Sequence, residues 1–333
     1  MTSLSRPKLI GSALALAAFA AAALSPQLLG AHVASAFEAL RGAERHWLLL
    51  AAAGFVAAFA CTVGAWRAAL QAAGGRICPK QAAARLAIGS MVNSFAPAKL
   101  GDAVKVALCS KAIDAPGSLW TTGGVYAALA ATRSLLLAAL LVVASATGAM
   151  PLWPAFVIVG IVAALAVAAS LSGRIRRHKH VAQVLDGLAS LERSPRALAA
   201  VVGWSAGMML CRLAATMATA AALDIPHPVL AALLILPALD VASAFPVTPG
   251  SIGIGSGAVA VALASRGIGM SEALGVGFAI QAVETLVSVT AGSLGVLYLT
   301  TTPAIRRWSL RFATVGGSVA VAAAFGLLLF DLV

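Results

Sequence analysis

Long apolar runs separated by short basic clusters constrain the fold of this chain more than any other feature. A helix needs about 20 apolar residues to cross a bilayer, and several runs reach that length. Because 61% of the 333 residues are hydrophobic and 10% are charged, no long polar segment remains in which a soluble domain could lie. We therefore expect an all-α polytopic membrane protein, with residues 1–333 forming a single integral membrane domain.

About seven membrane-spanning helices are predicted from these runs. They are expected at Leu9–Leu29, Trp47–Trp66, Leu119–Ala146, Trp153–Leu171, Leu198–Leu223, Ala273–Leu299 and 312–330. The tripeptide Ala34-Ser35-Ala36 resembles a signal-peptidase site. Cleavage there is the alternative to the retained first helix that we expect.

Two further apolar stretches are interrupted by residues that break helices. Residues 229–264 form two half-length segments joined through Pro246, Pro249 and closely spaced glycines, and residues 81–113 are broken around Asn93 and Pro97. Irregular backbone is tolerated at membrane depth only where protein or a water-filled cavity surrounds it, and in transporters such breaks mark the substrate site. We predict that both stretches are re-entrant elements.

The distribution of basic residues predicts the orientation. If the N-terminus is cytoplasmic and both broken stretches return to their own side, most of the 23 Lys and Arg residues lie in the cytoplasm, including the cluster at 174–179. This arrangement places the C-terminus outside a bacterial-type plasma (inner) membrane. The net charge of +12 is accounted for by these clusters, so we predict no binding of nucleic acid.

The predicted layout contains an inverted repeat. Residues 9–147 and 153–299 each hold two spans, a re-entrant element and a span, and the helix at 312–330 is additional. A short echo in sequence accompanies the pattern, Ser94-Phe95-Ala96-Pro97 in one half and Ala244-Phe245-Pro246 in the other. Inverted repeats are typical of secondary transporters.

Two blocks at the breaks resemble the signatures of a known family. The segment from Asn93 to Asp102, followed by Lys105, and the segment Pro246–Gly253 resemble the flippase-like transmembrane domain of lysylphosphatidylglycerol synthases. The resemblance covers roughly Leu9–Leu299. It implies translocation of a lipid, and some stand-alone members of this family are associated with glycolipid or hopanoid metabolism.

The chain departs from the family pattern at several positions. Asp102 stands where Glu is usual, Thr132 replaces the Glu of a Glu-Arg pair, and Ser256 lies about where the second block continues to Glu. The loss of acids argues against a cationic head group. Because the chain ends at Val333, we expect no aminoacyl-transfer domain, and hence neither lysyl-lipid synthesis nor another enzymatic activity.

Arg133 and Arg212 are the first candidate substrate-binding residues, because each lies within a predicted span. An arginine at the bilayer centre costs at least about 2.5–3.5 kcal/mol and persists when it is paired or faces water. The two arginines could bind the phosphate of an anionic lipid through their planar sets of donors. Alternatively they form structural ion pairs with Asp240 or Glu284, which are also the candidates for proton coupling.

The remaining candidate residues lie at the breaks. Around the first break, polar side chains could line a vestibule, or the charged ones could extend to the membrane surface; they are Asn93, Lys99, Asp102 and Lys105. Around the second break, backbone amides could approach a phosphate, or the glycines could serve helix packing; these residues are Pro249, Gly250 and Gly253.

These observations predict a flippase for a polar lipid, either an anionic phosphate-bearing lipid or one of glycolipid or hopanoid type. A non-transporting scaffold for enzymes of lipid or envelope synthesis is the alternative, and a small-solute channel or carrier is a third possibility. The sequence shows no Ser-His-Asp order, metal-ligand spacing or nucleotide-binding loop. We therefore predict no catalytic residue, cofactor or metal, and membrane lipids as the partners.

Overall fold

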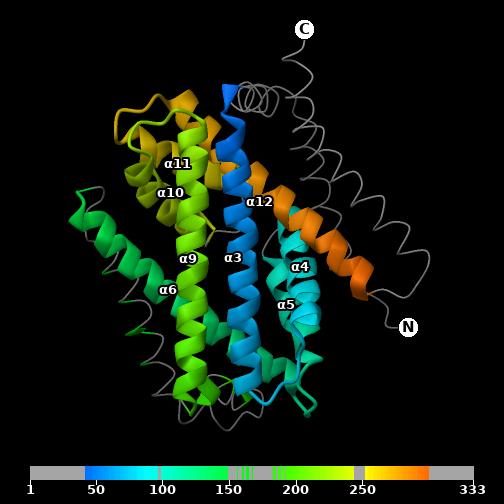
Figure 1. Cartoon of the computed structure of the whole chain (residues 1–333). Coiled ribbons are helices and arrows are strands. Elements are labelled where there is room, and N and C mark those ends of the chain that lie inside the picture. Colours follow the sequence, from blue (N-terminus) through cyan, green and yellow to red (C-terminus); the bar gives the residue numbers. More distant parts are fainter. Residues whose placement is uncertain are drawn as a thin grey trace, which may run out of the picture.

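The computed structural model describes residues 42–96, 99–148, 193–243 and 252–299, together with single positions between 156 and 191 (Figure 1). The regular secondary structure of this part of the chain is helical. The helices are α3 (Arg45–Ala72), α4 (Pro79–Phe95), α5 (Leu100–Ser110), α6 (Ser118–Ala146), α9 (Pro195–Ala222), α10 (Pro228–Ala242), α11 (Ile252–Ala264) and α12 (Met270–Leu299).

Four of these helices, α3, α6, α9 and α12, are long and apolar enough to cross a membrane. They coincide with the predicted second, third, fifth and sixth spans to within three residues at either end, except that α3 continues six residues beyond Trp66. The spans predicted at 9–29 and 312–330 lie outside the described residues, as does most of the span at 153–171. The prediction of an all-α polytopic membrane protein is confirmed.

Helices α3 and α9 form an antiparallel pair at the centre of the molecule (Figure 1). The amide of Glu44, just before α3, donates a hydrogen bond to the carbonyl oxygen of Ala222 at the end of α9, 3.1 Å away. Small residues allow the two backbones to approach, since a Cβ at Gly54 would lie 2.9 Å from the Cβ of Ala215. Helices α4, α6, α10 and α12 pack around this pair.

Each interrupted stretch forms two short helices that pack against each other, α4 with α5 and α10 with α11. Pro79 and Pro228 begin α4 and α10, where a missing amide hydrogen costs nothing. Helices α4 and α5 approach so closely that a Cβ at Gly101 would collide with the carbonyl oxygen of Gly89. The predicted interruptions are therefore present, while the return of each pair to one side of the membrane stays a prediction.

Four buried apolar clusters lie within the described residues, and two of them are large. One is built mainly from α3 to α6 and contains Trp66, Leu70 and Leu86. The other is built mainly from α9 to α12 and contains Ile235 and Ile280. The two large clusters thus lie mainly in different halves, while the two smaller ones join α6 of the first half to α9 and α10 of the second.

The helices of the two halves correspond in order and spacing. Their starting positions differ by 149 to 152 residues (45 and 195, 79 and 228, 100 and 252, 118 and 270). The packing corresponds as well: α4 contacts α12 as α10 contacts α6, α5 contacts α6 as α11 contacts α12, and α3 contacts α4 as α9 contacts α10. These correspondences agree with the predicted repeat, which stays a prediction, and the two halves meet at the α3–α9 and α4–α12 contacts.

Candidate functional site

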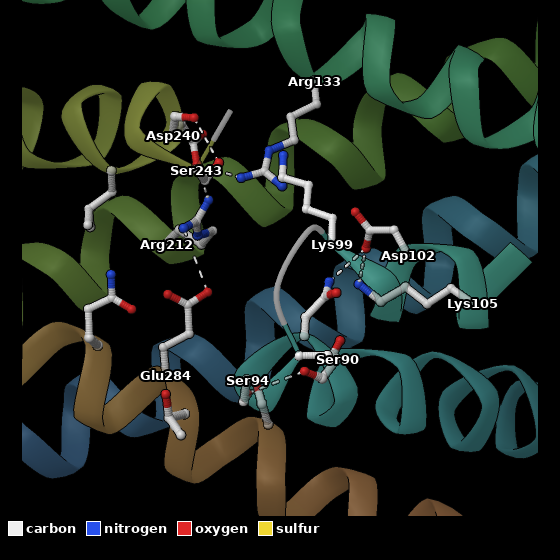
Figure 2. Close-up of a pocket in the computed structure, with 16 residues that line it drawn as sticks. Ser90, Ser94, Lys99, Asp102, Lys105, Arg133, Arg212, Asp240, Ser243 and Glu284 are labelled. Atoms are coloured by element: carbon white, nitrogen blue, oxygen red, sulfur yellow. Dashed lines mark hydrogen bonds and ion pairs between the residues drawn. The ribbon is translucent and has the colours of Figure 1, made fainter. Parts of the chain in front are cut away.

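A polar cavity of roughly 250 Å³ lies between the two halves, where the ends of α4 and α10 meet α6, α9 and α12 (Figure 2). Its described walls carry side chains from both breaks and from three of the long helices. They include Ser90, Asn93, Ser94, Lys99, Asp102, Lys105, Arg133, Arg212, Asp240, Ser243, Gln281, Glu284, Thr285 and Ser288. The fold thus brings together residues that lie far apart in the sequence.

A second compartment of roughly 420 Å³ overlaps the polar one. The two share ten lining residues, among them all seven charged ones: Lys99, Asp102, Lys105, Arg133, Arg212, Asp240 and Glu284. Helix α3 supplies aromatic side chains to this compartment, and α6, α9 and α12 supply aliphatic ones. Its apolar lining includes Phe55, Phe59, Trp66, Leu129, Leu137, Met208 and Val287. The whole cavity is therefore amphiphilic, with charged side chains and apolar side chains in its lining.

Four charged residues on four helices form one network in the polar compartment (Figure 2). Arg133 on α6 and Arg212 on α9 both donate to Oδ1 of Asp240 on α10, at 2.5 and 2.7 Å. The Nη2 atom of Arg212 also lies 3.7 Å from Oε1 of Glu284 on α12. Asp240 is thus the centre of a connection that links α6, α9, α10 and α12.

The members of this network differ in burial. The side chains of Asp240 and Arg212 are 5% and 12% exposed, whereas those of Arg133 and Glu284 are 43% and 42% exposed. Oδ2 of Asp240 and Nε of Arg212 are buried and have no hydrogen-bond partner within the described part of the chain. Buried polar atoms normally have a partner, so these two atoms retain the capacity to bind a ligand group or water.

A second polar cluster surrounds Asp102, on the short helix α5. Its Oδ1 accepts hydrogen bonds from Asn93 at 2.8 Å and Lys105 at 3.0 Å, and its Oδ2 accepts one from the hydroxyl of Tyr126 at 2.8 Å. Burial alone would raise the pKa of Asp102, but Lys105 and these hydrogen bonds outweigh burial and hold the pKa below its ordinary value. Asp102 is therefore ionised at neutral pH and fixes the residues around the first break.

Lys99 lies in the break between α4 and α5 and lines both compartments. Its backbone adopts the left-handed conformation, with φ of 53° and ψ of 33°, directly before α5. Glycine adopts this conformation more readily than other residues. Non-glycine residues that adopt it are often found at functional sites. The side chain is exposed to the cavity.

The candidates at the second break are placed differently. Pro249 and Gly250 lie outside the described residues. Gly253 lies in the first turn of α11 and is exposed, with no atom within 4 Å of a Cβ built on it. It is not among the residues that line either compartment.

Sequence reasoning did not identify several residues of the cavity. Ser90 precedes Asn93 by three residues and Ser243 follows Asp240 by three, so helical periodicity places each on the same face as a predicted candidate. Tyr126, the anchor of Asp102, lies in an apolar span. The signal for it was available, since Tyr126 is one of only two tyrosines in the chain.

Comparison with protein families matches residues 9–292 to the lysylphosphatidylglycerol synthase TM region. No curated protein matches the sequence. The matched range contains both interrupted stretches, the Asp240 network and the Asp102 cluster. The expected membership is confirmed, and it associates the chain with a membrane domain involved in lipid handling. The protein belongs to the family of the lysylphosphatidylglycerol synthase transmembrane region.

Proposed function

We propose that this protein is a flippase that moves a polar, phosphate-bearing anionic lipid across the bacterial inner membrane. The observation that carries the proposal is the amphiphilic cavity, which is lined by seven charged side chains and by aromatic and aliphatic side chains from α3, α6, α9 and α12. A lipid head group and the start of its tails have the same combination of polar and apolar surface. A carrier of small polar solutes has no comparable need for an apolar lining.

The cost of keeping charge inside a membrane domain supports the same function. Arg133 lies near the middle of α6, and Arg212 lies well inside α9. Ionisable residues inside membrane helices usually face a cavity, pair with one another and mark a substrate path. Both properties hold here, because the arginines pair with Asp240 and line the cavity.

The correspondence of the two halves suggests how access could alternate, through an inverted repeat whose halves rock against each other. Ser90 and Asp240 are 150 residues apart, as are Asn93 and Ser243, and all four line the cavity. The side chains of Cys61 and Cys211, also 150 residues apart, interact where α3 meets α9. This arrangement favours a pseudo-two-fold axis that passes between α3 and α9, beside the cavity.

Reconstitution into liposomes tests the function. Fluorescent phosphatidylglycerol is placed in both leaflets, and a membrane-impermeant quencher reports the lipid that reaches the outer leaflet. Wild type is compared with empty vesicles, with the Arg133→Ala, Arg212→Ala double variant, and with an Arg193→Ala, Arg196→Ala double variant. The last removes two exposed arginines that do not line the cavity.

Flippase activity requires that wild type and the Arg193, Arg196 control accelerate quenching and that the cavity variant does not. A non-transporting scaffold would leave the quenching rate of empty vesicles unchanged for every variant. In that case, co-purification of lipid-synthesis enzymes would become the relevant measurement.

A further inference from the structure

The charges of the cavity do not balance. The described residues that line it include four cations and three carboxylates. The cations are Lys99, Lys105, Arg133 and Arg212, and the carboxylates are Asp102, Asp240 and Glu284. These seven side chains therefore carry one net positive charge.

The excess charge belongs to Lys99. Lys105 pairs with Asp102 at 3.0 Å. The two arginines share Asp240, and Arg212 also approaches Glu284. Lys99 has no carboxylate within 4.0 Å in the described part of the chain. The arginines expected to bind phosphate are thus already compensated, whereas Lys99 is not.

The position of Lys99 also directs it toward an anion. It is the residue before the first turn of α5, an 11-residue helix that has no side-chain cap. The amide groups at a helix N-terminus favour negative charge nearby. Its side chain lines both compartments, as do those of the other charged residues of the cavity.

We propose that Lys99 selects lipids whose head group carries a single negative charge, such as the phosphodiester of phosphatidylglycerol. This inference rests on the proposed translocation and names the substrate class of the same site. A monoanion makes the cavity neutral. A phosphomonoester, with a charge of about −1.5 to −2 at neutral pH, leaves an uncompensated negative charge, and a neutral glycolipid leaves Lys99 uncompensated, which is costly away from bulk water.

The experiment measures the rate of movement of three fluorescent lipids at pH 8. These are phosphatidylglycerol, phosphatidic acid as the phosphomonoester, and a neutral glucosyl diacylglycerol. Wild type is compared with Lys99→Gln, which removes the charge, and Lys99→Arg, which keeps it. Lys80→Gln is the matched control, because Lys80 is exposed and lies outside the cavity.

Wild type is expected to move phosphatidylglycerol about tenfold faster than either other lipid, a difference of about 1.4 kcal/mol. Lys99→Gln should abolish this preference and raise the relative rate for the neutral lipid, while Lys99→Arg and Lys80→Gln keep it. If Lys99→Gln folds poorly, Lys99→Gly removes the same charge and suits the left-handed backbone.

The outcomes separate this inference from the proposed function. If wild type moves none of the lipids, the flippase function itself fails. If wild type moves all three at equal rates, or the charge-free variants keep the preference for phosphatidylglycerol, translocation stands and the selection by Lys99 is wrong.

Discussion

Arg133 on α6 donates a hydrogen bond of 2.5 Å to Asp240 on α10, a residue 107 positions further along the chain. Arg212 donates to the same carboxylate oxygen from α9. One carboxylate thus compensates two arginines on different helices. Removing it would leave both cations without their principal partner, whereas removing either arginine would leave the carboxylate with the other.

Asp240→Asn is therefore expected to destabilise the fold by about 3 kcal/mol, the usual cost of breaking a buried ion pair. Glu284→Gln is the comparison. Glu284 is half-exposed and lies 3.7 Å from Arg212, so its loss should cost less than about 1 kcal/mol. The free energy of unfolding in mixed SDS and detergent micelles measures both changes. Equal losses in the two variants would contradict the central role of Asp240.

The two arginines should differ in what their removal affects. Arg133 is 43% exposed and faces the cavity, so Arg133→Ala should lower lipid movement at least about tenfold with a loss of stability below about 1 kcal/mol. Arg212 is 12% exposed, so Arg212→Ala should destabilise the fold more than Arg133→Ala does, although less than Asp240→Asn, because Arg133 still pairs with Asp240. Transport rates and unfolding curves of the same preparations test this prediction. It is wrong if Arg133→Ala loses more stability than Arg212→Ala.

Tyr126 anchors Asp102 from α6 through a hydrogen bond of 2.8 Å. Tyr126→Phe leaves the ring that lies against Trp66 and removes this bond, at an expected cost of about 1 kcal/mol. The chain offers a matched control, since Tyr298→Phe changes the exposed tyrosine near the end of α12. The unfolding curve of Tyr298→Phe should coincide with that of wild type, whereas the curve of Tyr126→Phe should show the loss of stability.

The stability supplied by Asp102 should depend on pH in a defined direction. Because its folded-state pKa lies below the ordinary value of 3.8, ionised Asp102 stabilises the folded state fully above that value. The contribution is lost as the pH falls through the lower, folded-state pKa. Wild type and Asp102→Asn should therefore differ by the same free energy of unfolding from pH 7 to pH 5, and the difference should shrink below about pH 4. A difference that vanished already at pH 6 would exclude this assignment.

The arrangement of helices was predictable where composition alone decides it. Four apolar runs gave four long helices with nearly the expected ends, and prolines and glycines marked both interruptions. The requirement that Arg133 and Arg212 have acidic partners also follows from the cost of charge in a membrane. In each of these cases a single contribution to the free energy decides the structure.

The choice of partners was not predictable. Asp240 and Glu284 were both candidates, and the packing of α10 against α6 and α9 decides that Asp240 receives both arginines. The role of Tyr126 depends likewise on the contact between α5 and α6. Such contacts depend on how each helix is rotated about its own axis. This rotation cannot be read from the sequence of one helix alone.

Helix α12 packs against α4 more closely than a side chain would allow. A Cβ at Gly295 would lie 2.6 Å from the carbonyl oxygen of Ala84, so Gly295→Ala should cost about 1–3 kcal/mol through overpacking. Gly203→Ala is the control, because nothing lies within 4 Å of a Cβ at Gly203 in α9. There the helix propensity of alanine should raise stability by up to about 1 kcal/mol. Unfolding in SDS distinguishes the two, and a stabilised Gly295→Ala would contradict the close α4–α12 contact.

Lys99 offers the sharpest contrast between stability and function. A left-handed residue with a Cβ costs roughly 1–2 kcal/mol, and Lys99 is one of three non-glycine residues with positive φ in the described part of the chain. Lys99→Gly removes this cost but increases the conformational entropy of the unfolded chain. The free energy of unfolding is therefore expected to rise by about 0.5–1 kcal/mol.

The same substitution removes the uncompensated cation of the cavity, so the stabilised protein should lose its preference for monoanionic lipids. Lys99→Asn is an informative companion, because asparagine tolerates the left-handed conformation and is also uncharged. Both variants should unfold at higher SDS fractions than wild type and select lipids less well. If Lys99→Gly proved less stable than wild type, the side chain of Lys99 would contribute contacts that outweigh the strain of its backbone. If Lys99→Gly were more stable than wild type but equally selective, the backbone at Lys99 would be strained, and the proposed role of its charge in lipid selection would be wrong.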